Sequence, residues 1–123
     1  MEVVFLKSIS NDQRLLLLEN SNLLLYTPEN EHFGIVPVEA MYMGCIVMAC
    51  NSGGPLESVE DGVTGFLTNP DPKKWAQKIF TILDNNNKSK RVEMKVKAKE
   101  RVKKLFTIDV FAKSLESIVK EMK

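Results

Sequence analysis

Short apolar runs alternate along this chain with segments whose apolar residues recur at helical spacing. The runs Val3–Leu6, Leu23–Tyr26, Ile46–Cys50 and Gly65–Thr68 each predict a short strand. Continuous apolar runs of this kind, separated by helical segments, are typical of parallel strands that are buried on both faces. The pattern therefore predicts an α/β fold, a Rossmann-like parallel sheet of four strands with flanking helices.

The helices between these strands are predicted from their caps and their periodicity. Ser10 and Gln13 fit a capping box, which opens a helix that ends near Asn20 and has a broad apolar face at 15–18. A second helix, from about Phe33 to Tyr42, carries a proline in its first turn, where a missing N–H costs nothing. A single helical turn is expected after Pro55 and through Glu60.

Three more helices are predicted in the rest of the chain. Asp71 and Pro72 cap the first of them, and the asparagines 85–87 break it. Another helix follows this break, and a last one begins at Thr107. The side chains expected on the buried faces of the first two are Trp75, Ala76, Ile79, Phe80 and Leu83, and then Met94, Ala98, Val102 and Leu105.

The segment 23–50 places a polar turn between a predicted strand and a predicted helix. The turn contains Glu31, and Glu39 lies one to two turns into the helix. Ligands of open α/β sheets bind at this carboxyl edge, and the free N–H groups of a helix start favour phosphate. Ionised carboxylates accept hydrogen bonds from sugar hydroxyls. The pattern therefore predicts a site for a nucleotide sugar or a sugar phosphate.

Several motifs resemble those of a known enzyme family. The run EHFGIVPVEAM (31–41), followed by Gly44, resembles the E-x7-E signature of retaining GT-B glycosyltransferases. Its His-Phe-Gly-Ile-Val-Pro variant is similar to the α-1,3/α-1,6-mannosyltransferases of lipid-linked oligosaccharide assembly. The resemblance continues at NSGGPLE (51–57), VTGFL (63–67) and PDP (70–72). The joint pattern carries the resemblance, since two glutamates at this spacing are common by chance.

The resemblance implies roles for individual residues of the nucleotide-sugar site. Glu31 would contact hydroxyls of the donor sugar near the reacting carbon, and Glu39 the ribose hydroxyls. The backbone N–H groups and packing of the helix start would also bind the donor. His32 is expected to line the pocket or contact phosphate, with a role as general base the less favoured alternative. Residues of the helix start and of the next loop complete the expected donor site: Phe33, Gly34, Ile35, Val36, Gly53 and Gly54. The two glycines could equally make only a tight turn.

The resemblance also implies a reaction and a place in a larger protein. We expect residues 1–123 to form the later part of the C-terminal, nucleotide-sugar-binding domain of a GT-B fold, without the N-terminal acceptor domain. The donor would be GDP-mannose, and the acceptor a dolichol-diphosphate-linked oligosaccharide at the cytosolic face of the endoplasmic reticulum membrane, in protein N-glycosylation. No cofactor is expected. No metal is expected either, because the chain has no D-x-D motif and a metal-bridged diphosphate is therefore not predicted.

Two other functions remain open at this point. The chain could be a truncated, non-catalytic module or partner subunit that binds a nucleotide sugar without turnover. It could also be an unrelated Rossmann-like binding domain, although the glycine-rich dinucleotide fingerprint is missing. On either GT-B interpretation, the 123 residues alone are expected to be inactive.

Composition and charge narrow the classes of partner and compartment. The 123 residues include 44% hydrophobic residues, as an ordinary globular domain does, and carry a net charge of +1. Cys45 and Cys50 lie in or beside an apolar run, and free buried thiols are favoured over a disulfide. No apolar run approaches the roughly 18–20 residues of a membrane helix. The start MEVVFLKS is not expected to be a secretory signal.

Basic side chains are concentrated between residues 88 and 104. Nine lysines and arginines fall in this stretch, against two glutamates. A solvated helix face is the default interpretation, and attraction to an anionic membrane surface is the functional alternative. Nucleic acid is not an expected partner, because no aromatic residues are interspersed among these charges.

Overall fold

The computed structural model describes residues 2–30 and 35–105. Three strands form one parallel sheet in the order β1-β2-β3: β1 (Leu23–Tyr26), β2 (Ile46–Cys50) and β3 (Phe66–Thr68). Leu23 pairs with Ile46, and Met48 with Phe66. The predicted α/β fold with a Rossmann-like parallel sheet is confirmed, and these three strands lie where the apolar runs placed them.

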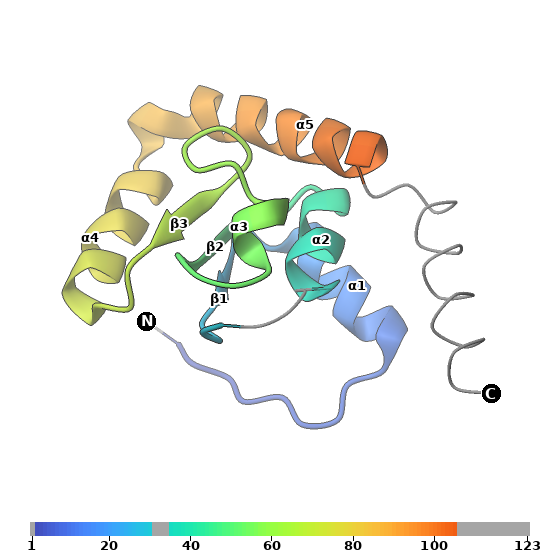
Figure 1. Cartoon of the computed structure of the whole chain (residues 1–123). Helices are drawn as coiled ribbons and strands as arrows, with labels where there is room; N and C mark the ends of the chain where they lie inside the picture. The colour runs from blue at the N-terminus through green and yellow to red at the C-terminus, as the bar shows by residue number, and fades with distance from the viewer. Residues whose placement is uncertain (1, 31–34, 106–123) are drawn as a thin grey trace.

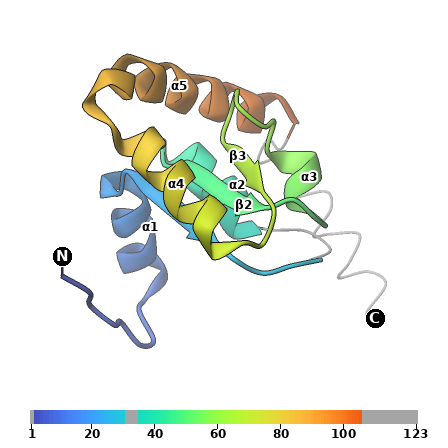
Figure 2. The same cartoon turned by 90° about the vertical axis from the view of Figure 1, so that its left-hand side faces the viewer.

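Five α-helices and one 3-10 helix connect and flank the strands in the described part of the chain. They are α1 (Asn11–Asn20), α2 (Ile35–Tyr42), α3 (Pro55–Ser58), α4 (Pro72–Leu83), η1 (Asn85–Asn87) and α5 (Lys88–Leu105). Figures 1 and 2 show α4 on one face of the sheet and α1 and α2 on the other, with α5 running across the edge where the strands begin. The opposite edge is therefore left to the loops that follow β1 and β2.

The core is centred on β2, the middle strand. All five of its residues are buried, because β1 and β3 pair with it on both sides and helices cover both faces. Met41 of α2 and Ala98 of α5 are fully buried, and α2 and α5 pack against each other over this strand. This packing fixes α2, the helix that follows the predicted ligand loop, relative to the sheet.

The caps predicted from the sequence are present. The Ser10 hydroxyl accepts a hydrogen bond from the Gln13 N–H at 3.2 Å, and the Gln13 side chain accepts one from the Ser10 N–H at 2.9 Å. Asp71 caps α4 by accepting from the Lys73 N–H at 3.0 Å. Gly44 has a φ of +79° just after α2, the left-handed conformation typical of a residue that ends a helix.

The strand predicted at Val3–Leu6 is wrong. These residues form no strand and are exposed, with Phe5 at 90%. An apolar run becomes a strand only when a neighbour supplies hydrogen bonds to its backbone, and Ser8, with a φ of +50°, turns the chain directly after this run. The sheet therefore has three strands in the described residues instead of four.

The predicted buried faces of three helices need correction. In α1 only Leu18 is buried, while Leu16 and Leu17 are exposed. The face of α4 is rotated from the prediction: Ile82 is buried, whereas Phe80 is 82% exposed and Ala76 and Leu83 are also exposed. The Trp75 indole N–H donates to the Asn69 carbonyl at 2.8 Å, and this anchor helps to fix which face turns inward. In α5 the predicted stripe is buried except at Leu105, which is exposed at the end of the helix.

Both cysteines are free and buried, as predicted. Burial raises the pKa of the Cys45 thiol above 9.0, although Lys95 acts in the opposite direction. Burial and then the nearby Glu29 carboxylate raise the pKa of Cys50. Since the thiolate is the nucleophile, both side chains should be unreactive in the folded chain at neutral pH.

We therefore expect a disulfide reagent such as Ellman's reagent at pH 8 to label both thiols at least about tenfold more slowly in the folded chain than in urea. The raised pKa values also set the pH dependence of stability. Their contribution is complete below pH 9.0, the ordinary thiol value, and is lost as the pH rises through the higher folded pKa. Thiol labelling at the same rate in the folded chain and in urea would contradict the buried placement of the two cysteines.

Candidate functional site

Two loops meet at the carboxyl edge of the sheet. The loop after β1 begins at Thr27, and the loop after β2 runs through Ser52 to Gly54. The Cys50 thiol donates to the Thr27 carbonyl at 3.2 Å, and the Asn30 N–H donates to the Ser52 hydroxyl at 3.0 Å. These two hydrogen bonds hold the loops side by side, as a site shared by adjacent parallel strands requires.

The backbone of both loops turns through left-handed conformations. Gly53 has a φ of +66° and Asn30 a φ of +55°. Glycine adopts this region without strain, and asparagine tolerates it better than most residues do. Gly53 is followed by the buried Gly54, the residue directly before α3, so the chain reverses sharply within a few residues. The predicted tight turn at Gly53–Gly54 is thus present, and a donor contact there stays a prediction.

Helix α2 presents its amino end to these loops. Its first residues, Ile35 and Val36, are exposed and half-buried respectively, whereas Pro37 and Val38 are buried against the core. The first N–H groups of a helix have no intrahelical acceptor, and the helix dipole adds partial positive charge there. The described part of α2 is therefore anchored on the core, with its amino end toward the edge where anions bind in α/β sheets.

Glu39 has a partner that sequence reasoning missed. Arg14 of α1 donates from Nη2 to Glu39 Oε1 at 3.2 Å, and the same Nη2 lies 3.2 Å from Oε2. Both side chains are partly buried, at 38% and 26% exposure. Glu39 Oε2 is buried and accepts no well-directed hydrogen bond from the described residues, so the Arg14 guanidinium is the partner that the structure shows for this carboxylate.

A second arginine supports the loop after β2 from behind. Arg101 of α5 donates from Nε to the Ser58 carbonyl at 2.9 Å and from Nη2 to the Glu57 carbonyl at 2.9 Å. Its Nη1 also lies 3.6 Å from a Glu60 carboxylate oxygen. These bonds satisfy carbonyls at the end of α3, a helix of four residues that continues directly from Gly54. Arg101 thereby links α5 to the loop, although it does not line the site.

The described residues cover part of the predicted site. Ile35, Val36 and Glu39 share α2, and Gly53 and Gly54 lie in the adjoining loop. Four predicted site residues lie outside the described residues, so their roles stay predictions: Glu31, His32, Phe33 and Gly34. Residues 2–30 and 35–105 contain no cluster of three histidine, cysteine or acidic side chains that could hold a metal ion.

Comparison with known proteins shows which protein family this chain resembles. The model of the family described as Glycosyl transferases group 1 matches residues 1–101. The chain is 45% identical over 120 residues to the alpha-1,3/1,6-mannosyltransferase ALG2 of Homo sapiens, an alignment that covers 98% of this chain and 28% of that protein. The chain thus spans little more than a quarter of this relative.

Solved structures share this fold, one of them in complex with a nucleotide sugar. The Anabaena protein Alr3699/HepE in complex with UDP-glucose superposes with a TM-score of 0.74 and is 30% identical, over 85% of this chain and 29% of that one. Sucrose-phosphate synthase from Thermosynechococcus elongatus superposes with a TM-score of 0.83 and is 26% identical, over 97% of this chain and 30% of that one. Both likenesses agree with a glycosyltransferase fold of the GT-B type.

Proposed function

The chain belongs to the group 1 glycosyl transferases, and from this membership we propose that it forms the donor-binding part of a retaining mannosyltransferase. The donor is GDP-mannose, and the acceptor is a dolichol-diphosphate-linked oligosaccharide of protein N-glycosylation. The identity to the human alpha-1,3/1,6-mannosyltransferase supports this choice of sugar and acceptor. The complex of Alr3699/HepE with UDP-glucose supports a nucleotide sugar as the ligand of this fold.

The observation that carries the proposal is the meeting of two loops and a helix start at one edge of the sheet. The cross-loop bond from the Asn30 N–H to Ser52 places the chain that leads into Glu31 beside the Gly53 turn. A nucleotide diphosphate bound there would lie against the amino end of α2. Backbone N–H groups fixed in advance stabilise negative charge as it develops on a leaving diphosphate.

The predicted residues 31–36 and Glu39 each have a role in this mechanism. Glu31 holds the hydroxyls of the mannose near the reacting carbon, and Glu39 accepts hydrogen bonds from the ribose. Phe33, Gly34, Ile35 and Val36 provide backbone N–H groups at the helix start, and His32 lines the pocket. The positive end of the helix dipole stabilises the negative charge that builds on the diphosphate, so the proposed mechanism requires no metal ion held by these residues.

A chimera tests the donor and the reaction. Residues 1–123 would replace the matching segment of the human relative, and the purified chimera would be assayed with a synthetic lipid-linked acceptor. We expect mannosyl transfer from GDP-mannose and none above background from UDP-glucose. An inactive but folded chimera, beside an active human parent, would contradict the proposed function.

The Arg14–Glu39 ion pair leads to a separate prediction about binding of the donor. We expect Arg14→Ala to raise the KM for GDP-mannose about two- to fivefold with little change in kcat, because Glu39 loses the partner that orients it. This magnitude corresponds to the roughly 0.2–1 kcal/mol of a partly exposed ion pair. Arg14→Lys should restore part of the affinity, and Glu19→Ala, an exposed acid on the same helix, should change nothing. An unchanged KM in Arg14→Ala would contradict the orienting role.

We also place the protein at the cytosolic face of the endoplasmic reticulum membrane, with α5 toward an anionic leaflet. None of the described helices combines the length and the apolar character needed to cross a bilayer. Six lysines of α5 are exposed and could meet lipid headgroups: Lys88, Lys90, Lys97, Lys99, Lys103 and Lys104. Arg91 and Arg101 instead bind backbone carbonyls, so they contribute less to such a surface. Electrostatic binding of α5 to an anionic membrane weakens as the salt concentration rises, whereas a helix face that is only solvated binds no membrane at any salt concentration.

A further inference from the structure

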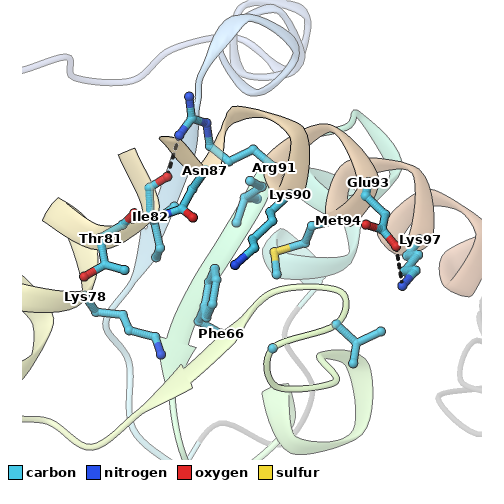
Figure 3. Close-up of a pocket in the computed structure, with 13 residues that line it drawn as sticks. Phe66, Lys78, Thr81, Ile82, Asn87, Lys90, Arg91, Glu93, Met94 and Lys97 are labelled. Carbon is cyan, nitrogen blue, oxygen red and sulfur yellow. Dashed lines mark hydrogen bonds and ion pairs between the residues drawn. The ribbon is translucent and has the colours of Figure 1, made fainter. Parts of the chain in front are cut away.

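A cavity of about 480 Å³ lies at the edge of the sheet opposite to the two loops. It is open to solvent on one side and lined by α4, by α5 and by the residues at which β2 and β3 begin, Ile46 and Phe66 (Figure 3). The candidate donor site follows the other ends of these strands. At roughly 3.3 Å per residue, the five residues of β2 separate the two sites by about 13 Å or more.

The floor of this cavity is apolar. Ile46 and Ile82 are buried at 0% and 4% exposure, and Met94 is at 9%. The ring of Phe66 is only half-buried, so it offers an accessible aromatic surface beside them. A floor of this kind favours a ligand with an apolar or planar part, because burying such a part removes apolar area from water.

Cations surround this floor. Lys78 comes from α4, while Lys90, Arg91 and Lys97 come from α5. The amino group of Lys78 is 4.9 Å from the centre of the Phe66 ring, and Figure 3 shows that of Lys90 also directed toward this ring. The one carboxylate among the lining residues, Glu93, is already bound by Lys97 at 2.9 Å. The lining therefore carries an excess of positive charge.

The two helices that carry these lysines are fixed relative to each other. Arg91 Nη1 donates to the Ile82 carbonyl at 2.6 Å and to the Asp84 carbonyl at 2.8 Å, and so ties α5 to the end of α4. The nearby Asp84 carboxylate accepts the Asn86 N–H at 2.9 Å and does not line the cavity. Lys78 and Lys90 are thus held on a rigid frame without a carboxylate partner of their own in the cavity lining.

We propose that this cavity is a second ligand site, separate from the donor site, that binds a phosphate ester. The phosphate lies between Lys78 and Lys90, and its apolar or planar substituent lies on Phe66 and Met94. A volume of about 480 Å³ is within the range of small-molecule sites and exceeds what a bare phosphate ion needs. The ester can come from a lipid headgroup or from a soluble metabolite, since both present the same group.

NMR titration of the 123-residue chain tests this site without any assay of activity. The probes are phenyl phosphate, dihexanoyl phosphatidic acid below its micelle concentration, and inorganic phosphate. We expect saturable shifts of the amides of Gly62, Val63 and Phe66, with either ester binding more tightly than inorganic phosphate. Tighter binding of phosphatidic acid than of phenyl phosphate identifies a lipid source, and the reverse a soluble one.

A pair of double variants separates the cavity from general charge. Lys78→Gln with Lys90→Gln should weaken ester binding at least about tenfold, the effect of losing charged hydrogen bonds. Lys73→Gln with Lys103→Gln removes the same charge from the same two helices outside the cavity, and should change affinity less than about twofold. Equal losses in both variants, or the absence of saturable shifts in a chain that gives a folded spectrum, would overturn the proposal.

Discussion

Replacement of Glu31 by alanine is expected to abolish mannosyl transfer in the chimera while the fold survives. The carboxylate is proposed to hold hydroxyls of the mannose next to the carbon that reacts. Loss of a fixed polar contact at a reacting centre costs about 10²–10³ in kcat. A polar side chain in the turn before a helix contributes little to the core, so the melting temperature should remain unchanged. Initial rates with GDP-mannose and the lipid-linked acceptor measure the effect.

Two controls make this result specific. Glu31→Gln keeps the size of the side chain and some hydrogen bonding but removes the charge, and it should recover only part of the activity. Glu19→Ala removes an exposed acid from α1, away from the two loops, and should retain full activity. Wild-type turnover by Glu31→Ala would refute the assignment of Glu31, even if the chimera itself transfers mannose.

The sheet was predictable because its strands are short apolar runs and the central one, β2, is buried on both faces. Every residue of β2 is buried, so the sequence shows Ile46–Cys50 as one uninterrupted apolar run between a helix end at Gly44 and the polar loop from Asn51. The caps at Ser10 and Asp71 were predictable for a different reason. Their hydrogen bonds join residues two or three positions apart, so the pattern is complete within a few letters of sequence.

Features that depend on distant partners were not predictable. Val3–Leu6 has the composition of a strand, but composition does not show whether a neighbouring strand is present. Helix α4 offers two apolar stripes at helical spacing. The inward turn of Ile82 in place of Phe80 depends on packing, and also on the Asn69 carbonyl that anchors Trp75. Local periodicity identifies an amphipathic helix more reliably than the side that faces the core.

The candidate site likewise has one part that could be predicted from sequence and one part that could not. Its place at the carboxyl edge follows from the order of strand, loop and helix, so the loop position of Gly53 and the helical position of Glu39 could be predicted from sequence, while their contacts with a donor stay predictions. Their supporting arginines could not be assigned: Arg14 is 25 positions from Glu39, and Arg101 is 43 from Ser58. A basic residue on a helix carries no local sign of a partner that far along the chain. Such contacts are found only when the fold is known.

Gly65→Ala is expected to destabilise the whole domain by about 1–3 kcal/mol, because a methyl group has no room there. A Cβ at this position would lie 2.7 Å from the Val47 carbonyl oxygen and 3.0 Å from Val59 Cγ1. The first neighbour is backbone of the central strand, which cannot move without disturbing β2. For a domain of this size, each kcal/mol lowers the melting temperature by about 2–8 °C.

Gly62 provides the matched control for Gly65→Ala, since the two glycines are constrained in different ways. Gly62 has a φ of +78° and open space around its Cα, so Gly62→Asn should cost little, because asparagine tolerates this conformation. Displacement of β3 by Gly65→Ala should also reach the site, since the Thr68 carbonyl accepts the Asn51 N–H at 3.2 Å at the start of the loop after β2. We therefore expect Gly65→Ala to lose both thermal stability and nucleotide binding, and Gly62→Asn to keep both. Equal melting temperatures for the two variants would contradict this prediction, because they would show that the chain at Gly65 can move away from Val47 without cost.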